Sequence, residues 1–321
     1  MFLAPHRDCE LTLNNIPIKP GAFCLLPTGA ILRDVHSLPV YYADIFDRFK
    51  PLDPKEAIVF AAQNVDFRFP GSDNGLHDFC FNALGGQMVG VMGGSGVGKS
   101  TLLSILNGSM APQKGQILIN GLDLYKEKQK LQGVIGFVPQ DDLLFDELTV
   151  YENLFYSSRL CLADLDEKAL KDRVSGILDE LNQLETCDLT VGSPLEKTIS
   201  GGQRKRLNIA LELIREPSIL LVDEPTSGLS SADSLNVISL LKEQSKRGKL
   251  IIIIIHQPSS DIFKMFDQLW ILDKGGRPIY TGNPIDAVVY FRKAIWQAGT
   301  KSAFVPSAVI STRNRSLILS R

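Results

Sequence analysis

Residues 93–101 have the composition and spacing of a loop that binds phosphate. They read Gly-Gly-Ser-Gly-Val-Gly-Lys-Ser-Thr, between an apolar stretch ending at Met92 and a helical pattern opening at Leu102. Backbone N–H groups of such a turn and of the helix N-terminus favour negative charge at one place. Lys99 adds a positive charge for the β- and γ-phosphates, and the Ser100 hydroxyl can hold Mg²⁺. Strand, turn and helix in this order predict a nucleoside triphosphate site, against the alternative of a chance glycine-rich turn.

Two acidic residues end an apolar run and suit phosphate hydrolysis. Residues 219–222 are all apolar, which predicts a strand buried on both faces, and Asp223 and Glu224 follow them directly. We expect Asp223 to bind Mg²⁺ through its waters and Glu224 to orient and deprotonate an attacking water. The alternative is a pair of helix-capping acids before Pro225.

Two further polar residues lie at predicted strand ends. The apolar run 250–255 places His256 at the tip of a buried strand, where we expect it to contact the γ-phosphate rather than to be an ordinary surface or core histidine. Gln140 ends the short stretch Phe137-Val138-Pro139, and its amide could touch Mg²⁺ or the attacking water.

A second candidate anion nest lies about 100 residues after the first. Ser200-Gly201-Gly202-Gln203 stands before Arg204-Lys205-Arg206 and an apolar helix over 207–214. Free N–H groups and a hydroxyl at a helix start can bind phosphate, although such a segment alone is an ordinary cap. Two nests in one chain are explained if two chains assemble around shared nucleotides.

The order of these five motifs resembles the ATP-binding cassette of the ABC transporter superfamily over about residues 57–292. Finer features resemble its G-type (White, or eye-pigment-precursor) branch and the bacterial relatives of that branch. These features lie at residues 149–154, 202–206, 223–229, 256–260, 266–267 and 279–282.

The resemblance implies a role for each matching residue. ATP would be cradled by Gly93, Gly94, Ser95, Gly96, Val97, Gly98, Lys99, Ser100 and Thr101. Mg²⁺ would be held by Ser100, Gln140 and Asp223, and catalysis would involve Glu224 as general base, His256 as γ-phosphate sensor and Gln140. Ser200, Gly201, Gly202 and Gln203 would close on the ATP of a second cassette. An early aromatic stacks on adenine in this family, and Phe69 is the candidate here, although it could equally be a core residue.

The sequence departs from the family pattern at two places. After Gly228-Leu229 the family usually has Asp in the loop that crosses between subunits, whereas this chain has Ser230. The uncharged hydroxyl puts the coupling of the two sites in doubt. Residues 299–321 carry no helical or strand periodicity, and we predict a basic, disordered or truncated tail rather than a polybasic membrane-binding segment.

Composition restricts the remaining classes. The chain has 321 residues, 44% hydrophobic content and a net charge of −2, so it can bury a full core and has no basic field that would recruit nucleic acid. Its five cysteines lack Cys-x-x-Cys spacing, which predicts free thiols and no zinc framework. The longest aliphatic run has six residues, far below the roughly 20 that span a bilayer.

The family resemblance, together with the positions of proline- and glycine-rich turns and linkers, predicts an α/β fold in three parts. We expect residues 1–55 to form a β-rich extension and linker that resembles the end of a preceding domain. Residues 56–298 form the P-loop cassette, with a mostly parallel core sheet, an N-terminal antiparallel β subdomain and a helical subdomain at about 143–215. Residues 299–321 are the tail.

The predicted function is an ATPase subunit or domain that powers an ABC transporter, with export favoured over import. Its expected partners are a second cassette, giving a homodimer, and a transmembrane permease on a separate chain or a missing C-terminal part. The expected location is the cytoplasmic face of the cell membrane. Apolar residues after Gln140 (Leu143, Leu144, Phe145) and the helix around Tyr151 and Phe155 would contact the permease. The alternatives are a soluble ABC ATPase acting on ribosomes or DNA, and a non-catalytic regulatory cassette.

Overall fold

The computed structural model describes residues 58–72, 74–162, 164–193 and 198–297, and short stretches between residues 2 and 41. The chain divides into two units, Met1–Ala57 and Ile58–Arg321. In the first unit, β1 (Phe2–Leu3) pairs with β4 (Cys24–Leu25), and a second sheet has the order β3-β2-β5-β6. Those strands span Ile16–Pro17, Leu11–Leu13, Ile31–Asp34 and Val40–Tyr41. The tail predicted at 299–321 lies outside the described residues.

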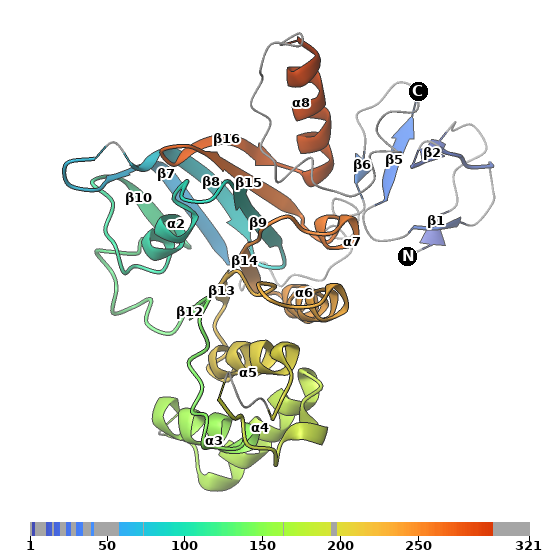
Figure 1. The fold of residues 1–321 in the computed structure, drawn as a ribbon. Helices are drawn as coiled ribbons and strands as arrows, with labels where there is room; N and C mark the ends of the chain where they lie inside the picture. Colours follow the sequence, from blue (N-terminus) through green and yellow to red (C-terminus); the bar gives the residue numbers. More distant parts are fainter. Residues whose placement is uncertain are drawn as a thin grey trace. The chain divides into compact units, whose positions relative to one another are not determined.

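A six-stranded sheet forms the centre of the second unit (Figure 1). Its order is β12 (Ile135–Val138), β13 (Ile219–Asp223), β14 (Leu250–Ile254), β9 (Met88–Gly93), β15 (Gln268–Asp273) and β16 (Arg277–Gly282). The first five strands are parallel, and β16 is antiparallel to β15. Carboxyl ends of parallel strands share one edge, so the residues after β9, β12, β13 and β14 are brought together.

The apolar character of these strands follows from burial on both faces. In β14, Ile251 and Ile253 belong to one core cluster, whereas Leu250, Ile252 and Ile254 belong to the other. Alternate side chains of a strand point to opposite faces, so a strand covered on both sides has no position for a polar residue. This is why the sequence reads as an unbroken aliphatic run.

One face of the central sheet is covered by a helix and a second sheet. Helix α2 (Lys99–Leu106) packs there with an antiparallel sheet of order β11-β10-β7-β8. These strands span Leu122–Asp123, Lys114–Ile119, Val59–Arg68 and Gly75–Leu84. Trp270 is fully buried in this layer, against Phe79 and Phe81.

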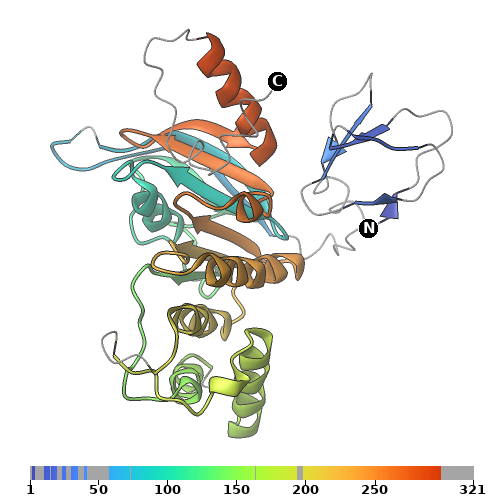
Figure 2. The same ribbon diagram turned by 45° about the vertical axis from the view of Figure 1, so that its right-hand side comes forward.

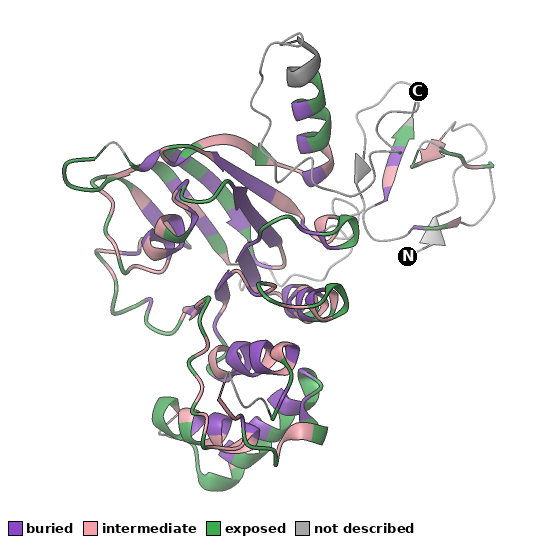
Figure 3. Cartoon of the chain, in the orientation of Figure 1, coloured by how far each residue is buried: buried purple, intermediate pink, exposed green. Residues whose placement is uncertain are grey.

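The opposite face is covered by helices. The core cluster on this face takes its buried residues from four helices: α5 (Gly201–Leu213), α6 (Ser231–Lys246), α7 (Ser260–Phe263) and the start of α8 (Pro284–Gln297). Helices α3 (Val150–Cys161) and α4 (Glu167–Glu180) pack beyond α5, bury one side and expose the other (Figures 2 and 3). Among the described residues, no helix combines the length and the apolar character that crossing a membrane requires.

Capping explains where two helices begin. Thr149 and Glu152 form a reciprocal capping box at α3, and Ser200 and Gln203 form one at α5. Helix α5 therefore starts at Gly201, before the apolar pattern that the sequence shows from Leu207. The extra turns carry Arg204 and Lys205 into the fold.

Candidate nucleotide site

The predicted phosphate loop connects β9 to α2 at the carboxyl edge of the central sheet. Gly98 precedes the helix with φ 103°, a left-handed conformation, and an added Cβ would lie 3.0 Å from the Gly75 carbonyl oxygen. Lys99 Nζ donates to the carbonyl oxygens of Gly93 (3.2 Å) and Gly94 (2.7 Å). The head group thus lies over the loop whose N–H groups would meet phosphate. Burial lowers the Lys99 pKa, and the nearby Glu224 and Asp223 charges oppose that shift.

Asp223 ends β13 and offers an oxygen for a cation. Asp223 is only 8% exposed, and its Oδ1 atom has no hydrogen-bond partner among the described residues. Burial raises the Asp223 pKa, and a hydrogen bond from the Ser100 side chain is the largest opposing effect. A buried carboxylate oxygen without a partner, beside a hydroxyl, fits a hard divalent cation such as Mg²⁺.

Glu224 is held between two predicted site residues. Its Oε1 lies 2.8 Å from His256 Nε2, and its Oε2 accepts a hydrogen bond from Gln140 Nε2 at 3.3 Å. Glu224 has φ 46°, and Gln257, directly after His256, has φ 42°. Non-glycine residues in this left-handed region cost of order 1–3 kcal/mol and cluster at functional sites.

The structure therefore brings most predicted site residues together. The phosphate loop, Asp223, Glu224 and His256 lie at the ends of β9, β13 and β14, and Gln140 lies two positions after β12. These four strands are adjacent in the sheet, although the residues are far apart in the sequence.

The second anion nest lies elsewhere. Helix α5 belongs to the core cluster on the opposite face of the sheet from α2. The nest packs against the start of α6, because an added Cβ at Gly202 would lie 2.9 Å from Asp233 Oδ1 and one at Gly201 would lie 3.2 Å from Leu229. These glycines permit that close approach.

Ser230, which stands where the family usually has Asp, has a structural role at the start of α6. It caps α6, since its hydroxyl oxygen accepts from the Asp233 N–H at 3.1 Å. The hydroxyl also lies 2.7 Å from Asp233 Oδ2, to which it donates.

Phe69 lines a cavity of about 270 Å³ beside the phosphate loop. Its ring is in edge contact with Phe67 and the residue is 41% exposed. Sequence reasoning missed four residues of this cavity, Ser72, Asn74, Gly75 and Gly275. Nothing in the local sequence links the tip of the β15–β16 hairpin, where Gly275 lies, to the phosphate loop.

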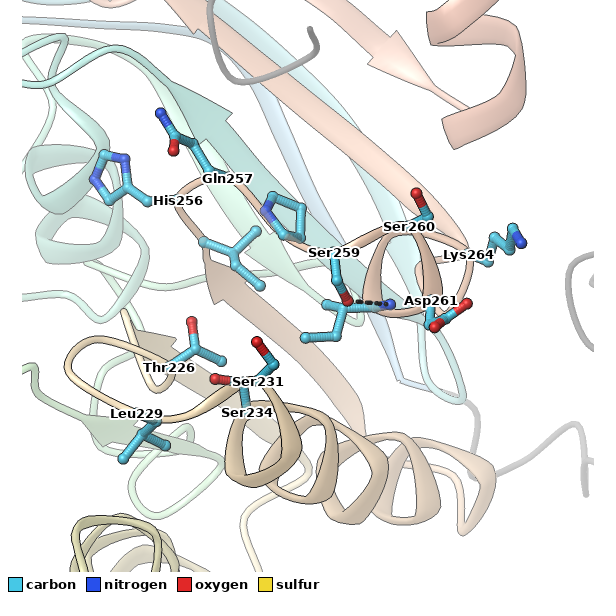
Figure 4. A pocket seen from close by; sticks show the side chains of 13 residues that line it. Thr226, Leu229, Ser231, Ser234, His256, Gln257, Ser259, Ser260, Asp261 and Lys264 are labelled. Carbon is cyan, nitrogen blue, oxygen red and sulfur yellow. Dashed lines mark hydrogen bonds between the residues drawn. The ribbon is translucent and has the colours of Figure 1, made fainter. Parts of the chain in front are cut away.

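A larger cavity of about 640 Å³ lies between the loop before α6 and the loop before α7. Figure 4 shows Thr226, Leu229, Ser231 and Ser234 on one side and residues from His256 to Lys264 on the other. His256 is thus shared between this cavity and the Glu224 site.

Comparisons with known proteins identify the type of domain and its fold. A family model described as ABC transporter matches residues 76–227, and one described as ABC-2 type transporter matches residues 256–296. The solved structure of cbiO1 from Clostridium perfringens, part of the ABC transporter complex cbiONQ, shares the fold. Its TM-score is 0.64 at 29% identity, covering 74% of this chain and 94% of that chain. The predicted fold class is confirmed.

Curated relatives identify the branch. The ABC-type transporter claG of Penicillium crustosum is 38% identical over 242 residues, 73% of this chain and 32% of that protein. ABC transporter G family member 22 of Arabidopsis thaliana is 43% identical over 211 residues, 64% of this chain and 27% of that protein. The matched part thus spans about a third or less of these relatives' length. The chain thus carries an ATP-binding cassette homologous to those of G-type ABC transporters, and members of this domain family are ATPases.

Proposed function

We propose that this cassette binds ATP with Mg²⁺ at the carboxyl edge of its central sheet, hydrolyses it, and thereby powers the movement of a substrate through a transmembrane domain. The observation that carries the proposal is the convergence of Lys99, Asp223 and Glu224, with Gln140 and His256 contacting Glu224. Charge-bearing and hydrogen-bonding groups converge there beside a glycine-rich anion nest, which is the arrangement that phosphoryl transfer to water needs.

Each residue has a role in the proposed reaction. The loop N–H groups and Lys99 hold the β- and γ-phosphates, so Lys99 exchanges its carbonyl contacts for phosphate oxygens. Glu224 accepts a proton from the attacking water, while His256 and Gln140 orient the carboxylate and the water. Ser100, Asp223 and Gln140 would hold Mg²⁺, which when bound neutralises the charge on the phosphate oxygens.

The second nest acts in the proposed assembly of two cassettes. Ser200 opens α5 on the face of the sheet away from α2, so it serves a nucleotide held by another cassette rather than its own. We propose a head-to-tail homodimer in which the loop around Ser230 enters the 640 Å³ cavity of the partner. The hydroxyl-rich lining of that cavity (Thr226, Ser231, Ser234, Ser259) suits the polar loop.

The transmembrane partner is proposed to contact the segment after Gln140. Leu143 and Phe145 are 67% and 64% exposed there, whereas Leu144, Tyr151 and Phe155 pack against the core. Neighbouring large apolar side chains left in water mark a contact site. The cassette would then lie at the cytoplasmic face of the membrane, and its G-type relationship favours export.

Site-specific photocrosslinking in cells tests this proposal. A photoreactive residue at Phe145 should capture an integral membrane protein, or a membrane segment of the same polypeptide. One at Leu84, which is also exposed but lies on β8, is the matched control and should not. Capture of ribosomal proteins at Phe145, with cofractionation of the chain with ribosomes, would replace transport by a soluble function.

A further inference from the structure

The segment after Gln140 is held to the start of α5 by ion pairs in which both cations are buried and the carboxylates are partly exposed. Lys205 Nζ donates to the main-chain carbonyl of Gln140 and lies 3.0 Å from Asp142 Oδ1. Arg204 Nε lies 3.3 Å from Asp142 Oδ2, so the two oxygens of one carboxylate meet two cations. The Arg204 and Lys205 side chains are 7% and 11% exposed. We refer to Asp142, Arg204 and Lys205 as the Asp142 clamp.

Further contacts extend the clamp along both segments. Arg204 Nη2 lies 3.1 Å from Asp146 Oδ1, and Nη1 donates to the Gly192 carbonyl. The Leu143 N–H donates to Asn208 Oδ1 at 3.4 Å. The side chains that make these contacts from α5, Arg204, Lys205 and Asn208, lie on adjacent turns of the helix. Because charges removed from water interact with little screening, residues 140–146 and the first two turns of α5 should move as one body.

The two ends of this body reach different places. At one end, Gln140 Nε2 donates to Glu224 Oε2. At the other, Ser200 caps α5 only four positions before Arg204. In the proposed function Gln140 serves the nucleotide of its own cassette, whereas Ser200 serves the nucleotide of the second cassette.

We propose that Asp142 is a positioning residue that couples the two nucleotide sites, so that closure of the Ser200 nest on one nucleotide is transmitted to the Gln140–Glu224 contact at the other. This inference rests on the proposed function and assigns the inter-site link to a side chain. Ser230 in the crossing loop carries no charge and is engaged with Asp233. The clamp therefore supplies a charged path between sites in this chain.

Hydrogen exchange on the purified chain tests the coupling without requiring turnover. With Mg²⁺ and adenylyl-imidodiphosphate, a non-hydrolysed ATP analogue, amides in 93–106, 140–146 and 201–208 should all become more protected. In Asp142→Asn, protection at 93–106 should remain while protection at 201–208 is lost. Asp142→Glu, which keeps the charge, should restore it. Asp172→Asn, which neutralises an exposed carboxylate on α4, should behave as the unaltered chain.

Kinetics supply a second measurement. Asp142→Asn should lower kcat by about 10- to 100-fold, since misplacement of an orienting group costs up to that much, and should change KM by no more than about twofold. Equal loss in Asp172→Asn would overturn the assignment, as would full activity in Asp142→Asn.

A double variant separates positioning from folding. Asp142→Asn leaves two buried cations without their shared carboxylate, which can destabilise the fold. Adding Lys205→Met removes one of those charges, so the melting temperature should recover. Protection at 201–208 should stay lost, because the Gln140 carbonyl is no longer held. Joint recovery of stability and protection would show that the clamp only holds the fold together and would overturn the proposal.

The unaltered chain distinguishes the two levels of inference. Protection at 93–106 without any change at 201–208 would overturn the clamp and leave the nucleotide site standing. If 93–106 did not respond to the analogue, the proposed function would fail and the clamp proposal would fall with it.

Discussion

His256 Nε2 lies 2.8 Å from Glu224 Oε1, while the other oxygen of Glu224 accepts from Gln140. The two carboxylate oxygens are thus both engaged by side chains of the cassette itself. A γ-phosphate and a water entering this site must take over part of these contacts. The arrangement holds the proposed base in one orientation and makes Glu224 the residue whose chemistry is most directly testable.

Glu224→Gln should slow ATP hydrolysis by about 10²- to 10⁴-fold, because the amide keeps the shape but cannot accept the proton. ATP affinity should stay close to that of the unaltered chain. With ATP intact, the variant should accumulate as a two-chain complex in sedimentation velocity with MgATP. An ATP-saturated monomer at high protein concentration would argue against the head-to-tail assembly.

Ser200→Arg, added to Glu224→Gln, should abolish that complex because a long side chain fills the second nest. ATP binding by the single cassette should persist, since Ser200 lies at α5 and the phosphate loop at α2. Sedimentation velocity measures the loss of the two-chain complex, and isothermal titration with ATP measures the affinity of the single cassette. Loss of ATP affinity in the double variant would place Ser200 in the chain's own site instead.

Lys99→Ala should weaken MgATP binding by about 10- to 150-fold. This range corresponds to the loss of one hydrogen bond to a charged group, which contributes roughly 1.5–3 kcal/mol. The loop backbone remains, so residual binding is expected. Lys126→Ala, which removes an exposed ammonium group, is the control and should bind normally. Unchanged affinity for a fluorescent ATP analogue in Lys99→Ala would remove Lys99 from the site.

Phe69→Ala should weaken ATP binding by about 5- to 150-fold, because base–aromatic stacking contributes about 1–3 kcal/mol. Phe69→Trp should retain binding, and inorganic triphosphate should bind both variants equally. Tyr156→Ala, an exposed aromatic on α3, is the control. If ATP affinity does not change, Phe69 is simply the packing partner of Phe67.

Asp223→Asn should abolish the Mg²⁺ dependence of ATP binding yet stabilise the metal-free chain at neutral pH. Burial raises the folded-state pKa of Asp223 above its ordinary 3.8, so the ionised form is disfavoured in the fold. That cost is absent below the unfolded pKa and fully present once the pH exceeds the folded pKa. Thermal melting in EDTA should show a higher melting temperature than that of the unaltered chain at pH 7.5, and this difference should disappear towards pH 4. A lower melting temperature at pH 7.5 would contradict this reading.

Local sequence was sufficient for much of the site. The phosphate loop, Asp223-Glu224 and His256 each follow an apolar run, and such runs are readable because both faces of their strands are buried. Because these strands are parallel and adjacent in the sheet, their carboxyl ends lie together at one edge. The convergence of these residues needed only the order of the strands in the sheet.

Other contacts depended on tertiary structure because their partners come from distant segments. Gly275 reaches the Phe69 cavity through the β15–β16 hairpin, which is placed by pairing with β9 and not by its own sequence. Nothing in the local sequence links Asp142 to Lys205, yet α5 begins early enough to bring the Lys205 ammonium group within 3.0 Å of the Asp142 carboxylate. The local sequence by itself thus determined where the motifs lie and where the strands end, since both follow from hydrophobic periodicity and turn residues. Which charges meet, and which are removed from water, was decided by packing between elements, because burial is a property of the whole fold.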